Sequence, residues 1–259
     1  MRKTAIALLT LCLAAIVAAP AMATVLLTET FGYADGNLVP NGGWATFSGA
    51  ATDIQVVSGR AVGFGPNAND DHVFFPVQPL TTKTYACFKV RIPAVTGAPK
   101  PIYFLALKDG GTTAFVSRVY VLPITGGFTF GLSHSSTSTT VGVVPWSAST
   151  LTYDQDYNIV INYDPVAQSS TMWVDPTNES SPSVSITNTA IAALAVQTVM
   201  LRQSATASTL PASPAYTGTA DWGFSVDYIG VGTTFTDACY AGTIAVAPNT
   251  WTNVKALYK

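Results

Sequence analysis

The chain has 259 residues and a formal net charge of −2, and only 10% of its residues are charged. It contains no basic run, so nucleic acid and anionic membrane surfaces are poor candidates for partners. Many short runs rich in aromatic and β-branched residues are separated by turn signals, whereas helical signal is almost absent. This pattern predicts an all-β fold, a two-sheet antiparallel β-sandwich.

The N-terminal segment 1–23 has the pattern of a signal peptide. A positively charged start precedes the apolar run 6–19, and Ala21-Met22-Ala23 fits the small-x-small rule for cleavage. The apolar run is too short for a membrane span, and no later stretch is long and apolar enough to be one. We therefore expect an exported protein, extracellular, at the cell surface or in the periplasm, whose mature chain begins at Thr24.

We expect residues 24–240 to form one sandwich domain. Its clearest feature is the meander 101–132, where Asp109-Gly110-Gly111 supplies the positive φ angles of a tight hairpin. The segment 65–71 is predicted as a polar loop, and 190–196 as at most one helical turn. In chain order, the predicted strands are 24–31, 44–47, 54–57, 60–64, 72–75, 83–92, 102–108, 114–122, 128–132, 157–164, 171–175, 197–203, 223–230 and 231–235.

The tail 241–259 differs from the sandwich. Thr250 is a candidate N-cap for a short helix, so we expect a short helix or a sorting or association segment. Low charge, Ser/Thr-rich edges and this tail would suit repeated contact between chains. A structural, self-associating extracellular protein, as a homo-oligomer or filament, is therefore one hypothesis for function.

Two cysteines follow the predicted cleavage site, Cys87 and Cys239. In an exported protein an even pair argues for one disulfide, and the alternative is two unpaired thiols. Alternation along 83–92 places Cys87 on the face opposite Ala86 and Phe88. The sequence therefore predicts Cys87 on an outer face, where a bond to the C-terminal region leaves the core closed.

Several motifs occur together along the chain: FxYxDGxL at 31–38, GGW at 42–44, YFLALKDG at 103–110, RVYV at 118–121, FTFGLS at 128–133, MLRQ at 200–203 and VDYIGVGTTF at 226–235. Together they are similar to a group of secreted, mostly uncharacterised bacterial proteins. That group in turn resembles the concanavalin A-like lectin/glucanase jelly roll, including laminin-G-like domains. The resemblance spans 25–237 and implies a jelly-roll β-sandwich, but the superfamily includes lectins, glycosidases, lyases, adhesion modules and structural proteins.

Residues for sugar cleavage are not evident. The chain has only two glutamates, Glu29 and Glu179, and no strand carries carboxylates at i, i+2 spacing, which would put both on one face. The resemblance to lyases of this fold would assign roles to Tyr120, Arg118 and His134, but no signature spacing supports them. We therefore favour a non-catalytic protein and keep a polysaccharide lyase or hydrolase as an alternative.

Carbohydrate binding needs aromatic faces with polar groups beside them. Trp146 lies in a predicted loop between a proline and a serine, and Trp44 follows a glycine-rich loop. Arg118 and Arg202 lie on predicted strands, and either line a sheet face or bridge to carboxylates such as Asp227. The leading hypothesis is a polysaccharide- or cell-surface-glycan-binding protein whose ligand-binding residues are Trp146, Trp44, Tyr120, Arg118 and Asp109.

Calcium is the candidate cofactor. Hard cations bind oxygen atoms of Asp, Asn and backbone carbonyls. Asn69, Asp70 and Asp71 offer such atoms within the predicted loop 65–71. Ordinary Asx turns are the alternative interpretation of these residues.

Overall fold

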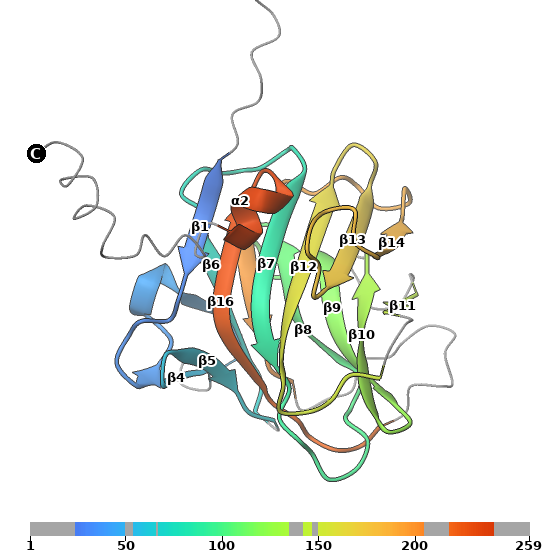
Figure 1. Ribbon diagram of the computed structural model, residues 1–259. Coiled ribbons are helices and arrows are strands. Elements are labelled where there is room, and N and C mark those ends of the chain that lie inside the picture. Colours follow the sequence, from blue (N-terminus) through green and yellow to red (C-terminus); the bar gives the residue numbers. More distant parts are fainter. Residues whose placement is uncertain are drawn as a thin grey trace, which may run out of the picture.

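The computed structural model describes residues 24–49, 54–65, 67–134, 142–146, 150–204 and 218–240. These residues form two antiparallel β-sheets packed face to face, which confirms the predicted all-β sandwich (Figure 1). The predicted signal peptide and the tail after position 240 lie outside the described residues. No helix in the described part of the chain is long and apolar enough to cross a membrane.

One sheet has nine strands and the other has seven. In the nine-stranded sheet the order is β14 (Val184–Thr187), β13 (Ser169–Val174), β12 (Asp156–Asp164), β7 (Thr84–Arg91), β16 (Phe224–Gly232), β5 (Arg60–Gly63), β4 (Gln55–Val57) and β2 (Gly36–Asn37), and β1 (Val25–Glu29) also pairs with β16. In the seven-stranded sheet the order is β11 (Val144–Pro145), β10 (Gly127–Ser133), β9 (Phe115–Ile124), β8 (Ile102–Lys108), β15 (Thr198–Arg202), β6 (Asn69–Phe74) and β3 (Ala45–Gly49).

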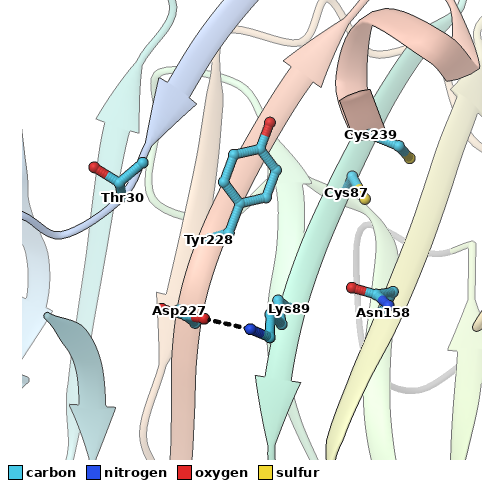
Figure 2. A pocket seen from close by; sticks show the side chains of 7 residues that line it. All are labelled: Thr30, Cys87, Lys89, Asn158, Asp227, Tyr228 and Cys239. Carbon is cyan, nitrogen blue, oxygen red and sulfur yellow. Dashed lines mark ion pairs between the residues drawn. The ribbon is translucent and has the colours of Figure 1, made fainter. Parts of the chain in front are cut away.

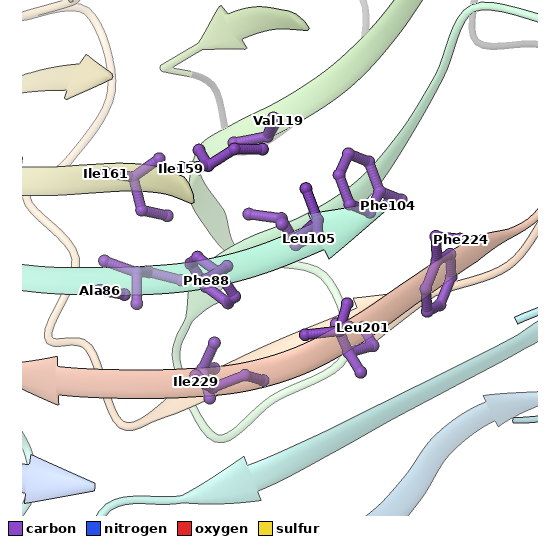
Figure 3. Packing of buried hydrophobic residues seen from close by; sticks show 14 of the residues in the cluster. Ala86, Phe88, Phe104, Leu105, Val119, Ile159, Ile161, Leu201, Phe224 and Ile229 are labelled. Atoms are coloured by element: carbon purple, nitrogen blue, oxygen red, sulfur yellow. The ribbon is translucent and has the colours of Figure 1, made fainter. Parts of the chain in front are cut away.

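The space between the sheets is filled by alternate side chains of their strands (Figure 3). In β7, Ala86 and Phe88 point into this core and are fully buried, as the alternation predicts. Across it lie Leu201 of β15 and two consecutive residues of β8, Phe104 and Leu105, which both reach the core because the pairing of β8 with β9 shifts between Tyr103 and Leu105. Burying each large side chain contributes about 1.5–3 kcal/mol, so this shared interior holds the two sheets together.

A short helix, α2 (Phe235–Tyr240), follows β16 directly and packs on the outer face of β16 and β7 (Figure 1). Phe235 and Ala238 of this helix form a small cluster with Tyr85 and Trp173, outside the main core. Gly230 permits the close approach, because a Cβ atom there would lie 1.9 Å from the Ala238 carbonyl oxygen. Because β16 ends at Gly232 and α2 begins at Phe235, the prediction of a strand over 231–235 is wrong beyond Gly232.

One further expectation differs from the structure. Strand β6 begins at Asn69, so residues 69–71 belong to a strand and not to the predicted polar loop. Pairing with β15 and β3 on both sides holds this polar sequence extended, which local sequence does not reveal. Residues 190–196, for which at most one helical turn is predicted, contain no helix. Val196 instead forms a bridge with Leu80.

Candidate functional site

The outer face of the seven-stranded sheet carries aromatic and cationic side chains separate from the central core. Tyr103 of β8 packs with Phe115 and Tyr120 of β9 away from the main hydrophobic cluster. Arg118 of β9 and Arg202 of β15 lie with their guanidinium groups over these rings. We call these five residues the arginine–tyrosine face.

A β-bulge explains why Phe115 and Arg118, which are three residues apart, lie on the same face. The pairing of β8 with β9 shifts between Leu105 and Leu107, so β9 has one extra residue there. Ser117 lies at this shift with a φ of 50°, and its hydroxyl bonds to strands β12 and β13 of the other sheet. Bulges of this kind redirect side chains, and they are common beside binding and active sites.

The two guanidinium groups share the ring of Tyr103. The Cζ atom of Arg202 lies 4.2 Å from the ring centroid, and that of Arg118 lies 4.8 Å from it. The Tyr120 ring is 5.6 Å from the Tyr103 ring. Arg118 is only 2% exposed, and its Nε–H donates no hydrogen bond. The face therefore holds a buried cation whose contacts are aromatic.

Asp70 of β6 supplies a carboxylate at the edge of this face. Its Oδ1 lies 3.3 Å from Nε of Arg202, and the two side chains are 17% and 22% exposed. Burial raises the pKa of Asp70 to about 6, although the positive charge of Arg202 acts in the opposite direction. The Asp70–Arg202 pair is thus the partly exposed end of the cluster. With a pKa of about 6, the Asp70 carboxyl group loses its proton as the pH rises through this value.

Lys108 extends the positive charge along β8. Its Nζ lies 4.6 Å from the centroid of the Phe47 ring and 3.0 Å from Nδ1 of His72, and it donates to the Asp109 carbonyl at 2.7 Å. Burial lowers the pKa of Lys108, and burial together with the Lys108 charge lowers the pKa of His72 to about 4. Neutral His72 can therefore accept the ammonium proton in a hydrogen bond.

Of the predicted ligand-binding residues, Arg118 and Tyr120 belong to the arginine–tyrosine face. Tyr103 and Phe115 also belong to this face, and the sequence does not predict this, because a bulge interrupts the alternation that relates Phe115 to Arg118. For Arg118 and Arg202, the sequence leaves open whether each lines a sheet face or bridges to a carboxylate such as Asp227. In the structure both lie on the sheet face, and Arg202 also bridges to a carboxylate, that of Asp70.

The other predicted ligand-binding residues lie elsewhere. Trp44 is 2% exposed in the core, where its Nε1–H donates to Glu29 Oε2 at 2.9 Å. Trp146 is half-buried against the central core at the β10–β11 edge. The Asp109 carboxylate accepts the backbone N–H of Gly111 at 2.9 Å in the hairpin turn. These three residues therefore lie at separate positions and do not form one ligand-binding site in this structure.

The three predicted calcium ligands lie on one strand, whose alternation separates them. Asp70 faces Arg202, whereas Asp71 accepts hydrogen bonds from Thr46 and Asn69 at 2.8 and 3.0 Å. These residues do not fit a single three-ligand site. In the described ranges, no group of three His, Cys, Asp or Glu side chains is arranged to hold a metal ion.

The residues considered for catalysis are also separated. His134 is fully buried, with Nδ1 2.7 Å from the Ser170 hydroxyl of β13, so it faces the other sheet and not Arg118. Glu29 accepts hydrogen bonds from Trp44 and Tyr33, and the pKa of Tyr33 rises to about 12 because of burial and the Glu29 contact. Neither arrangement pairs two carboxyl groups across a groove.

A second site lies on the outer face of the nine-stranded sheet beside α2 (Figure 2). It is a pocket of about 300 Å³ in which an ion pair joins Lys89 to Asp227 at 2.8 Å. Asp227 also lies 3.5 Å from Arg60, so it is not the partner of Arg118. The lining residues are Thr30, Cys87, Lys89, Asn158, Asp227, Tyr228 and Cys239.

The two cysteines face each other at one end of this pocket, which we call the thiol pocket (Figure 2). Both are free thiols, so the predicted disulfide is not formed in this structure. Contact with the Cys87 thiol and burial raise the pKa of Cys239. Cys87 lies on the outer face of β7, as predicted, yet it is buried because α2 packs over it.

Comparisons with known proteins identify the fold. No family model matches the chain, and no curated protein matches it. Among solved structures, it is similar to the CBM2 module of Lactobacillus casei BL23 phage J-1 evolved Dit, with a TM-score of 0.51 and 11% identity over 82% of this chain and 96% of that one. It is also similar to the alginate lyase Aly36B, with a TM-score of 0.51 and 10% identity over 81% of this chain and 96% of that one.

Proposed function

We propose that this chain is an exported, non-catalytic jelly-roll protein that binds a carbohydrate or another cell-surface polymer at the arginine–tyrosine face. The observation that supports this best is that the Tyr103 ring, which is 8% exposed, contacts two guanidinium groups, and that one of these, Arg202, has a partly exposed side chain. Aromatic rings pack against sugar C–H groups, and guanidinium donors bond to oxygen atoms. One structural neighbour is an alginate lyase, which by its name acts on a polysaccharide.

Retention of the purified chain on gels containing different soluble glycans tests this function. Replacing Tyr103 with leucine should weaken binding tenfold or more, as expected for an aromatic residue at the centre of a binding site. The matched control is Tyr228→Leu, which removes a tyrosine from the thiol pocket on the opposite side. Equal retention of wild type and Tyr103→Leu, or equal loss in both variants, would contradict the proposal.

A polysaccharide lyase is the second candidate, because Arg118 and Tyr120 share a face and Asp70 lies at its edge. A lyase would release unsaturated products, which absorb ultraviolet light. Incubation of the chain with acidic polysaccharides, followed by absorbance and product analysis, separates the two functions. Turnover that is lost in Tyr120→Phe would favour the lyase.

We also propose that the exported protein carries a Cys87–Cys239 disulfide. The support is that the two thiols are in contact in the thiol pocket and that oxidising compartments favour such bonds. An oxidant bearing a disulfide would accept the two electrons and two protons released when the bond forms. Mass measurement of the secreted chain before and after reduction should show a difference of two hydrogens, and equal masses would contradict the bond.

Calcium binding and self-association are separate proposals. Repeating the glycan assay with calcium and with a chelator tests calcium binding, and sedimentation of the full chain tests self-association.

For calcium, Asp71 and Asn69 are the nearest pair of candidate oxygen ligands, because they lie on one face of β6. Equal glycan retention in both solutions would contradict a calcium requirement.

A further inference from the structure

The arginine–tyrosine face contains more cationic groups than its neighbourhood neutralises. Arg118, Arg202 and Lys108 all lie on the outer side of the seven-stranded sheet, each over an aromatic ring. Within the described residues, the ion pair of Asp70 with Arg202 is the one salt bridge made by any of the three. This positive excess occurs in a chain whose formal net charge is −2.

Arg118 is the member of this group whose charge is least compensated. It is 2% exposed, its Nε–H is buried without an acceptor, and no described carboxylate forms an ion pair with it. Its charge is met by the faces of Tyr103 at 4.8 Å and Phe115 at 5.1 Å. A buried ion is strongly unfavourable unless it is paired and hydrogen-bonded, so the fold gives up stability to keep a guanidinium here.

The fold also stabilises the position of this group. The bulge at Ser117 turns Arg118 toward Phe115, and a residue in this backbone region is tolerated only when its surroundings hold it. The guanidinium groups of Arg118 and Arg202 both contact the ring of Tyr103. A rigidly held guanidinium whose buried Nε–H lacks an acceptor is suited to a planar or tetrahedral oxyanion.

We propose that the saccharide bound at this face is anionic, and that its oxyanion, a uronate carboxylate or a sulfate ester, binds to Arg118. This inference rests on the proposed function and adds the chemical class of ligand. The sugar ring that carries the anion would pack against Tyr103, which is 8% exposed, whereas Tyr120 is 2% exposed and packs against the Tyr103 ring. The partly exposed Arg202–Asp70 pair marks the edge from which the ligand enters.

Matched oligosaccharides test the charge directly. The dissociation constant of the full chain is measured for oligogalacturonate and for its methyl ester, which differ only in the charge of the carboxyl group. Sulfated dextran and dextran form the second pair. We expect the charged member of at least one pair to bind tenfold or more tightly, the ratio expected for a hydrogen-bonded charge pair. The pair that shows this difference identifies the oxyanion.

Variants assign the effect to Arg118. Arg118→Met should remove the preference for the charged ligand, and Arg118→Lys should keep part of it, because the charge stays and the planar fork is lost. The control Lys83→Met removes a cation that is 44% exposed and pairs with Asp164, and it should leave the preference unchanged. An unchanged preference in Arg118→Met would overturn the inference.

A stability measurement separates a ligand-binding role from a structural one. Without ligand, Arg118→Met should raise Tm by about 2–4 °C, because it removes an uncompensated buried charge. A fall in Tm would show that Arg118 supports the fold and would count against the inference. If charged and neutral glycans bind equally, the inference fails while the proposed function stands. If no glycan binds, the proposed function itself fails.

Discussion

Asp70 shows how burial changes the behaviour of a single residue. Its pKa is raised from 3.8 to about 6 by burial, while Arg202 opposes this and Asp71 adds to it. Ser48 of β3 donates a hydrogen bond to its carboxylate, and Tyr103 faces it from β8. The folded state therefore binds this proton more tightly than the unfolded state does. This contribution to stability is fully present below pH 3.8 and is lost as pH rises through about 6.

Asp70→Asn should remove this pH dependence. The shift corresponds to about 3 kcal/mol, so the free energy of unfolding of the variant relative to wild type should increase by about 2–3 kcal/mol between pH 4 and pH 7. Urea denaturation at both pH values measures this difference. His72 is present in both proteins, so its contribution to the pH dependence of unfolding cancels when the variant is compared with wild type. A constant difference at all pH values would mean that Asp70 is not buried as described.

At the level of elements, α2 depends on a glycine in the strand beneath it. The Cβ of an alanine at position 230 would lie 1.9 Å from the Ala238 carbonyl and 2.4 Å from the Tyr228 hydroxyl. The first contact is with backbone, so α2 must move away from β16. The cluster around Phe235 would then open and expose Cys87.

Gly230→Ala should therefore increase the reactivity of Cys87 toward a thiol reagent in the reduced protein by tenfold or more. It should also lower the free energy of unfolding by about 1–3 kcal/mol, as overpacking does. The matched control is Gly142→Ala, since no atom lies within 4 Å of a Cβ there. Similar thiol reactivity in the two variants would show that α2 does not protect Cys87.

At the level of the whole molecule, both sheets share one interior, so their stabilities should be linked. Phe88 of β7 is fully buried in that interior together with Phe104 of β8 and Leu201 of β15. Removing a large core side chain loses its burial and leaves a cavity, which costs about 3–5 kcal/mol for phenylalanine. The effect should reach both sheets.

Phe88→Ala should lower the free energy of unfolding by about 3–5 kcal/mol while unfolding stays a single transition. Tryptophan fluorescence and far-ultraviolet circular dichroism followed through urea denaturation should coincide. Val166→Ala is the control, because Val166 is 90% exposed and its loss should change stability by less than about 0.5 kcal/mol. Two separate transitions would contradict the prediction of one domain over 24–240.

The sequence by itself determined the elements that depend on local pattern. Strand β8 was predicted with its observed bounds, and the alternation in β7 correctly assigned Ala86 to the core and Cys87 to the outer face. It also identified Arg118 and Tyr120, two residues of the candidate site. Turn residues and alternation are properties of neighbouring residues, which is why these features were accessible without tertiary information.

Only the tertiary structure decided which distant residues meet. Pairing of β15 with β8 and β6 brings Arg202 over Tyr103, and the bulge at Ser117 brings Phe115 to the same face as Arg118. Packing of α2 over β7 buries a cysteine that alternation places outside. Strand partners, bulges and covering helices arise from contacts between segments far apart in the chain, and local sequence carries little information about them.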